Sequence, residues 1–269
     1  MEQESRFERG LKKLAEVDGH AGEEVGNSLN AIFPDMGRYL VEYVFGDIYC
    51  RDGLALKSKE VAVVAALTAM GTAEPQLRVH INAALNVGCT ISEVQEIILQ
   101  MSAYAGFPAC INAMNALKSV LQDRRRQGME DSPGAGPTTA APPGERYEAG
   151  VRQLAVLDDR QLARLKDAYD DISPDLVKLI VCCMADISAR NNLDIKHREI
   201  ATIAALTAMG NAQPQLKFHI NAGLNVGITV DEVKEIMLLM SVYAGFPSAI
   251  NGTNILKEVI DEHEGNVAS

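Results

Sequence analysis

The apolar residues of this chain recur every three to four positions, and glycine and proline interrupt the pattern at intervals. Val61, Val64 and Ala65 share one face of a predicted helix, with Ser58 as its expected N-cap and Gly71 after its last turn. The same signals predict further helices over residues 75–86, 90–104 and 108–122. No segment alternates apolar and polar residues as a strand does, so the pattern predicts an all-α fold.

The chain contains this helical pattern twice. When the sequence is shifted by 139 residues, 39 of the 59 positions in 60–118 are identical to those in 199–257. Further upstream, the likeness continues with one residue of slippage. We therefore expect two tandem domains, 1–126 and 146–269, each a bundle of about six or seven helices.

A segment rich in proline and glycine joins the two copies. Residues 127–145 hold four prolines and four glycines, a composition that does not form a core. We expect this linker to be a loop or partly disordered, and long enough to let the copies pack directly on each other. We also expect that contact to bury much of the apolar surface of the last two helices of each copy.

Charge and composition exclude some classes of partner. The formal charge is −11, and the only basic run, 124–126, lies at a helix end, so nucleic acid is not an expected partner. The longest apolar run, around 61–70, is too short to span a bilayer, and the charged N-terminus does not resemble a secretory signal. The five cysteines fall at different places in the two copies, which argues against a disulfide framework. We expect a cytoplasmic protein without a membrane partner.

One histidine is present in both copies. His80 lies in the predicted helix 75–86, and His219 occupies the same place in the second copy. Imidazole titrates near neutral pH, so one interpretation is a proton donor and acceptor in a pocket. The alternative is a histidine that is only hydrogen-bonded in a polar seam between helices.

Other repeated polar residues are candidates for a binding site. Asp47 and Arg51, four residues apart, form either an intrahelical salt bridge or part of a site for an anionic substrate. Glu60 either stabilises a helix N-terminus or belongs to the site, and Tyr104 either anchors a turn or contributes its hydroxyl to a pocket. The candidate substrate-binding residues are Arg78, Lys217, Asp47, Asp186, Arg51, Arg190, Glu60, Glu199, Tyr104 and Tyr243.

Several common catalytic motifs are absent from the sequence. There is no Gly-rich phosphate loop, no Cys-x-x-Cys, no His-Glu-x-x-His and no Gly-x-Ser-x-Gly. Each copy repeats only one histidine, which is too few for a zinc site. We therefore expect neither a metal nor a cofactor.

Four motifs carry a resemblance to a known family. They are Phe-Gly-Asp-Ile-Tyr, Leu-Thr-Ala-Met-Gly, Leu-Arg-Val-His-Ile-Asn-Ala-Ala-Leu-Asn-Val-Gly and Tyr-Ala-Gly-Phe-Pro-Ala, in that order. As a set they resemble the carboxymuconolactone decarboxylase family, which includes the alkylhydroperoxidase D-like thiol proteins; the likeness covers 34–121 and 174–260. The resemblance implies an alkylhydroperoxidase D-like helical bundle in each copy, hexamers of single domains, and sites between subunits.

The decarboxylase branch of the family implies a catalytic role for His80 and His219, a small carboxylated lactone as substrate, and no metal. Loss of carbon dioxide leaves an enolate that must be neutralised and protonated, which suits histidine. Members of this branch usually carry Arg two residues after the histidine, where this chain has Asn82 and Asn221. This departure removes a bidentate carboxylate clamp, which Arg78 replaces only if its side chain points the same way.

The peroxidase branch carries a Cys-x-x-Cys whose second cysteine stands four residues before the histidine. This chain has Ala73 and Gln76 at those places in the first copy, so the thiolate nucleophile is missing and thiol peroxidase activity is disfavoured. We predict a metal-free carboxy-lyase acting on a small carboxylated lactone or keto acid. The alternative is a non-catalytic binding or structural oligomer of the same fold. In either case we expect a homotrimer, a pseudo-hexamer of domains.

Overall fold

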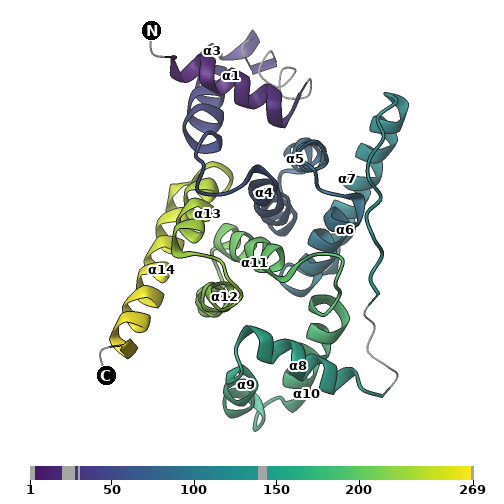
Figure 1. Cartoon of the computed structure of the whole chain (residues 1–269), viewed down its shortest axis with the longest axis vertical. Helices are drawn as coiled ribbons and strands as arrows, with labels where there is room; N and C mark the ends of the chain where they lie inside the picture. The colour runs from purple at the N-terminus through teal and green to yellow at the C-terminus, as the bar shows by residue number, and fades with distance from the viewer. Residues whose placement is uncertain (1–3, 20–27, 30, 139–143, 268–269) are drawn as a thin grey trace.

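The computed structural model describes residues 4–19, 28–29, 31–138 and 144–267, and all regular structure within these ranges is helical (Figure 1). The all-α prediction is therefore confirmed for the described part of the chain. No helix in that part is long and apolar enough to cross a membrane.

Each copy is a helical bundle. In the first copy, the helices are α1 (Arg6–Val17), α3 (Pro34–Tyr39), the π-helix η1 (Leu40–Tyr49), α4 (Leu56–Met70), α5 (Glu74–Asn86), α6 (Ile91–Gln100), the short 3-10 helix η2 (Met101–Ala103) and α7 (Phe107–Arg126). In the second copy, they are α8 (Arg146–Leu157), α9 (Gln161–Tyr169), α10 (Pro174–Cys183), the π-helix η3 (Met184–Ser188), α11 (Ile195–Met209), α12 (Gln213–Asn225), α13 (Val230–Tyr243) and α14 (Phe246–Val267).

Local sequence signals explain most of the helix ends. Thr90 and Glu93 form the expected capping box at the start of α6, because each side chain bonds the other's backbone N–H. Gly71 ends α4 in the left-handed region, with φ of 65°. The N-cap expectation for Ser58 is wrong: α4 begins two residues earlier, and the Ser58 hydroxyl instead lies 3.2 Å from Nε2 of His197 in the other copy.

The two copies pack on each other mainly through α4 and α11, which lie side by side at the centre of the molecule (Figure 1). Most residues of both helices are buried, so neither shows a polar face toward solvent. α6 and α13 also contact the opposite copy, whereas α7 and α14 lie on the outer sides. The expectation that the last two helices form the contact is therefore wrong for the last one. Phe107 of α7 and Phe246 of α14 remain exposed.

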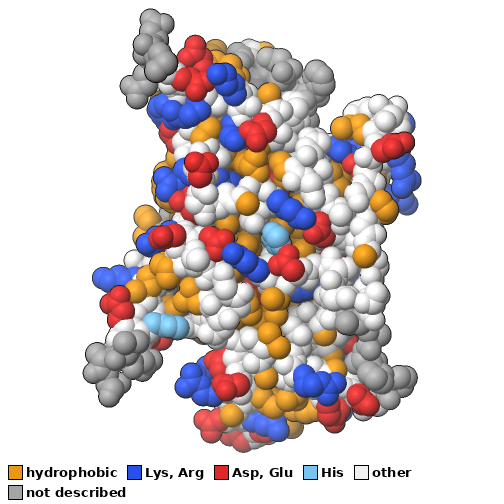
Figure 2. All heavy atoms as spheres, in the orientation of Figure 1, with side chains coloured by type: hydrophobic (Ala, Val, Ile, Leu, Met, Phe, Trp, Pro, Cys, Tyr) orange, Lys and Arg blue, Asp and Glu red, His pale blue; other side chains and the backbone are white. Residues whose placement is uncertain are grey.

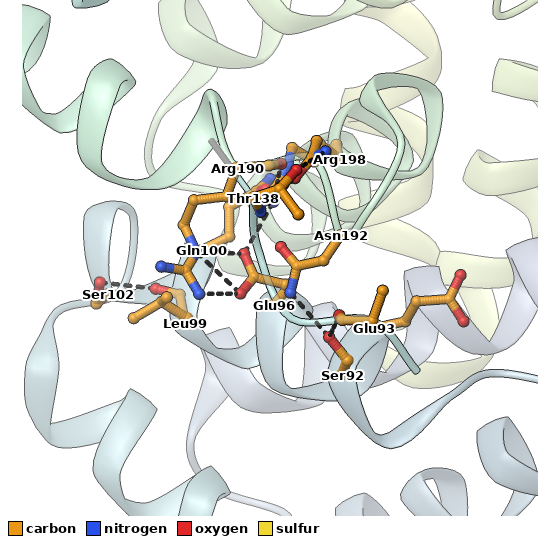
Figure 3. Close-up of polar contacts among 12 residues, drawn as sticks. Ser92, Glu93, Glu96, Leu99, Gln100, Ser102, Thr138, Arg190, Asn192 and Arg198 are labelled. Carbon is orange, nitrogen blue, oxygen red and sulfur yellow. Dashed lines mark hydrogen bonds and ion pairs between the residues drawn. The ribbon is translucent and has the colours of Figure 1, made fainter. Parts of the chain in front are cut away.

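Ion pairs between the copies flank the central contact. Glu96 of α6 is buried and accepts hydrogen bonds from Arg190 and Arg198 of the second copy (Figure 3). At the related place on the other side, Arg51 donates to both oxygens of Glu235 on α13 at 2.8 and 2.6 Å. A buried carboxylate is stable only with such partners, so these pairs hold the two copies in one relative orientation.

Part of the linker is bound to the first copy. Asp131 accepts hydrogen bonds of 2.7 to 3.0 Å from Arg124, and the carbonyls of Ser132 and Pro133 accept from the first backbone N–H groups of α6. Residues 127–138 contain no helix or strand, as expected of a loop. Residues 139–143 of the linker lie outside the described residues.

Candidate active site

Each copy pairs its repeated histidine with its repeated glutamate. Nδ1 of His80 on α5 lies 2.9 Å from Oε2 of Glu60 on α4, and Nδ1 of His219 on α12 lies 2.7 Å from Oε2 of Glu199 on α11. None of the four side chains is more than 7% exposed. An ionised glutamate only accepts, so this bond fixes a proton on Nδ1 and leaves Nε2 as the atom that can face a reacting group.

A tyrosine from the opposite copy stands against each histidine. The Tyr243 ring lies at 90° to the His80 ring with centroids 4.9 Å apart, and the Tyr104 ring lies at 79° to the His219 ring at 5.3 Å. Each site therefore contains side chains from both copies. Six of the candidate residues therefore lie in two sites: Glu60, His80 and Tyr243 in the first, and Glu199, His219 and Tyr104 in the second.

A further tyrosine enters the first site, and the sequence analysis did not single it out. Tyr49, at the end of η1, donates to Oε1 of Glu60 at 2.7 Å, and its oxygen lies 2.9 Å from the Tyr243 hydroxyl. Because the Tyr49 proton goes to Glu60, the Tyr243 hydroxyl donates to Tyr49. Both oxygens of Glu60 are thus engaged, one by Tyr49 and one by His80.

The second site lacks this tyrosine. The repeat places Ser188 where the first copy has Tyr49, and the Ser188 hydroxyl contacts the sulfur of Met184 at 3.7 Å. The Tyr104 hydroxyl lies 3.2 Å from Nε2 of His219. In the second site, the histidine therefore has hydrogen-bond partners at both ring nitrogens.

Burial and neighbouring charges act in opposite directions on His80. Burial alone would lower its pKa, but the hydrogen-bonded Glu60 carboxylate and the nearby Asp18 carboxylate outweigh it, so the pKa of His80 lies above its ordinary value. Burial, with Glu60 adding to it, raises the pKa of Tyr49 and of Tyr243 well above the ordinary value. The site therefore holds neutral phenols beside an imidazole whose protonated form is stabilised by Glu60 and Asp18.

Asp18 is a second residue of this region that the sequence analysis missed. It follows the last residue of α1, is 4% exposed, and its Oδ1 has no hydrogen-bond partner among the described residues. Burial raises the pKa of Asp18 to about 7; the charge of His80 opposes the rise and that of Glu60 adds to it. The only sequence signal was the alignment of Asp18 with Asp158 in the second copy, which does not reveal burial.

The charged candidates Asp47, Arg51 and their counterparts pair elsewhere. Asp47 binds Arg6 of α1, and Arg51 binds Glu235 of the other copy, so the two do not form the intrahelical bridge. The second copy repeats this arrangement, with Asp186 bound to Arg146 and Arg190 bound to Glu96. Arg51 and Arg190 thus join the copies, and neither contacts a Glu–His pair directly.

Arg78 and Lys217 face the outer helices instead of the histidines. Arg78 donates to Asp123 on α7, and Lys217 contacts two glutamates on α14. Asn82 points the same way as Arg78, because its Oδ1 accepts a 2.5 Å bond from Arg124 on α7. The position at which decarboxylases of the family usually carry Arg thus faces away from Glu60 within this chain.

Two cavities lie away from the histidines, one between the copies and one on the first copy. A cavity of about 350 Å³ is lined by Ser92, Glu96, Arg190, Asn192 and linker glycines, and a second, of about 290 Å³, lies between α6 and α7. Neither histidine pair lines them. Among the described residues, no three His, Cys, Asp or Glu side chains are arranged to hold a metal ion. On the face shown in Figure 2, acidic and basic side chains are interspersed and form no continuous basic patch.

Comparison with known proteins identifies the family. The sequence model of the carboxymuconolactone decarboxylase family matches residues 34–119 and 174–258. The chain is similar to a 4-carboxymuconolactone decarboxylase of Acinetobacter baylyi, with 34% identity over 125 residues, which are 46% of this chain and 92% of the relative. It is also similar to a nitrosuccinic acid decarboxylase of Metarhizium robertsii, with 31% identity over 125 residues, covering 45% and 85% of the two chains.

The fold is shared with a solved structure from Burkholderia xenovorans that is described as a gamma-carboxymuconolactone decarboxylase subunit. The match covers 97% of this chain and 99% of that one, with a TM-score of 0.59 and 20% sequence identity. The family match falls on both halves of the chain and includes both Glu–His pairs. The chain belongs to the carboxymuconolactone decarboxylase family, as two copies in tandem.

Proposed function

We propose that this protein is a carboxy-lyase that releases carbon dioxide from a small carboxylated lactone or keto acid, with a helix-borne histidine as proton donor and acceptor. The observation that carries the proposal is the buried Glu60–His80 pair, in which Nε2 has no hydrogen-bond partner among the described residues. Two relatives support the reaction class, because their names specify decarboxylation of different small carboxylic acids.

The pair suits the proton transfer that follows loss of carbon dioxide. The bond between the carboxyl group and its carbon breaks, and the electron pair moves into an adjacent carbonyl as an enolate. A protonated His80, favoured by its raised pKa, neutralises that charge and delivers the Nε2 proton to carbon. Glu60 keeps the ring oriented and stabilises the imidazolium, and water returns the proton.

Burial disfavours the thiolate form of three of the five cysteines. Burial raises the pKa of Cys89 to about 12, and it also raises the pKa of Cys110 and of Cys183. These groups are neutral thiols at physiological pH, whereas the nucleophile of a thiol peroxidase is a thiolate. We therefore propose no peroxidase activity.

A non-catalytic oligomer is the second candidate function. It is favoured by the near-complete burial of His80 and His219 and by the absence of both from the lining of the two cavities described above. In that case, the Glu–His pairs are structural hydrogen bonds between helices.

A screen for carbon dioxide release decides between these candidates. The full-length protein is tested with small γ-carboxylated lactones and with β-keto acids such as acetoacetate and oxaloacetate. We expect release above the spontaneous rate from at least one class, and loss of that release in the double variant His80→Ala, His219→Ala. Circular dichroism confirms that the variant is folded. A wild-type protein that releases nothing from any of these compounds supports the non-catalytic alternative.

We also propose that the working assembly is a homotrimer in the cytoplasm. Phe107 and Ile111 of α7 and Phe246 and Ile250 of α14 are 56% to 68% exposed at equivalent places in the two copies, and contact with further chains would cover them. Light scattering at micromolar concentration should give about three times the 29.1 kDa chain mass. A mass near that of one chain would contradict the trimer.

A further inference from the structure

The repeat relates the two Glu–His pairs, but the surroundings of Nε2, the atom that would meet a substrate, differ between them. Nε2 of His80 has no partner among the described residues, whereas Nε2 of His219 accepts from the Tyr104 hydroxyl at 3.2 Å. A substrate that exchanges a proton with His219 must first displace this hydroxyl. The same step at His80 displaces no hydrogen bond.

One substitution between the copies explains the difference. Tyr49 accepts the hydrogen bond of the Tyr243 hydroxyl, and no hydrogen bond joins that hydroxyl to His80 among the described residues. Ser188 replaces Tyr49 in the second copy and bonds within its own helix, so no tyrosine of the described residues engages the Tyr104 hydroxyl, which contacts Nε2 of His219. The two sites are therefore built differently by sequence.

Asp18 and Asp158, which follow the first helix of each copy, also differ in their hydrogen-bond partners. Asp158 is paired with Arg164 at 2.6 Å and accepts from the backbone N–H of Arg160 at 2.9 Å. Asp18 makes no comparable pair: its Oδ1 is buried without a partner among the described residues, and its charge raises the pKa of His80 and of Tyr243. A buried polar atom left unpaired is unfavourable unless something else pairs it.

We infer that the two sites have diverged: the His80 site alone carries turnover, and Asp18 is a substrate-binding residue of that site that donates a hydrogen bond from its neutral carboxyl group. This inference rests on the proposed carboxy-lyase function and adds to it the choice of site and a second acid. The substrate class is an anion whose carbonyl oxygen gains charge as carbon dioxide leaves.

The two acids have separate tasks in this arrangement. As the carbon–carboxyl bond breaks, the electron pair moves to the carbonyl oxygen, and Asp18 donates a hydrogen bond to that oxygen without losing its proton. His80 then protonates the carbon from Nε2 and regains a proton from water. A neutral Asp18 also avoids repelling the anionic substrate. Burial keeps the pKa of Asp18 near 7, where the neutral form is still populated.

Single variants of the full chain test the choice of site. Carbon dioxide release is measured with whichever lactone or β-keto acid the wild-type protein turns over fastest. His80→Ala should lower kcat about 100-fold, and His219→Ala by less than about threefold. Asp18→Leu should lower kcat about 100-fold by removing one donor. Asp18→Asn, whose amide still donates, should retain much of the rate, and Asp158→Asn serves as the matched control. Equal losses in the two histidine variants, or a wild-type rate in folded Asp18→Leu, would overturn the inference.

A second readout needs no turnover, and so separates failure of this inference from failure of the proposed function. The imidazole resonances of His80 and His219 are followed by NMR. Asp18→Asn should lower the pKa of His80, because the ionised form of Asp18, populated above pH about 7, raises it, and should move no resonance of His219. Tyr104→Phe should shift the Nε2 resonance of His219, whereas Tyr243→Phe should leave that of His80 largely in place. Matching responses at the two sites would overturn the inference even in a protein that releases no carbon dioxide.

Discussion

Replacing Asp18 by asparagine should stabilise the protein above neutral pH. Asp18 is 4% exposed, and burial raises its pKa from 3.8 to about 7. The pKa of Asp18 is higher in the folded protein than in the unfolded chain. Its ionisation therefore does not affect the free energy of unfolding below pH ~4 and lowers it as the pH rises from there through 7. At about 1.4 kcal/mol per pH unit, ionising Asp18 inside the folded protein costs about 4 kcal/mol in full. Asparagine has nearly the same shape and does not ionise, so it removes this cost.

Urea unfolding of wild type, Asp18→Asn and Asp158→Asn at two pH values measures the effect. The stability gained by Asp18→Asn should be about 3 kcal/mol larger at pH 8.5 than at pH 5. The reason is that Asp18 ionises near pH ~4 in the unfolded chain but only near pH ~7 in the folded protein. Asp158 is already ion-paired with the exposed Arg164, so Asp158→Asn should bring no such gain. An Asp18→Asn effect that is the same at both pH values, or destabilising at pH 8.5, would refute the reasoning.

Three further predictions concern packing, ion pairs and thiols. Glu96→Ala leaves the buried Arg198 without its carboxylate and should lower the free energy of unfolding in urea by about 3–5 kcal/mol. Asp47→Ala removes an exposed ion pair and should cost less than about 1 kcal/mol. Equal effects of the two variants would contradict the account. Gly10→Ala places a Cβ 2.2 Å from the Val41 carbonyl oxygen and should destabilise the fold by about 1–3 kcal/mol, seen as a lower Tm. Gly265→Ala is the control, because no atom of the described residues outside its own stretch of helix lies within 4 Å of the added Cβ there. Serine or alanine in place of every cysteine should leave carbon dioxide release intact, and an inactive but folded Cys50→Ser would argue against this.

The parts of the fold that depend on local signals could be predicted from the sequence. The capping box at Thr90 and the left-handed Gly71 act within one turn of the chain, so the C-terminal end of α4 and the start of α6 follow from neighbouring residues. The tandem organisation follows from the repeat itself. The contact between copies does not, because α4 and α11 are buried on most sides and have no apolar stripe that distinguishes a partner face.

The candidate site could be predicted only in part. The repeat marked His80 and Glu60, which are close in the fold because α4 and α5 are adjacent. It could not show that Arg51 reaches Glu235 instead of Asp47, since that depends on the other copy. It also could not distinguish Asp18 from Asp158, because the same residue type is buried in one copy and ion-paired in the other.

The most direct test of the central claim is the fate of the proton in the product. The reaction is run in D₂O with a carboxylated substrate whose decarboxylated carbon becomes a CH₂ group, and the product is examined by NMR. A histidine on a fixed helix delivers its proton from one side, so the account predicts one deuterium, on one face of that carbon, and loss of this product in the double histidine variant. Deuterium spread equally over both faces, or the same product formed by the folded double variant, would contradict it.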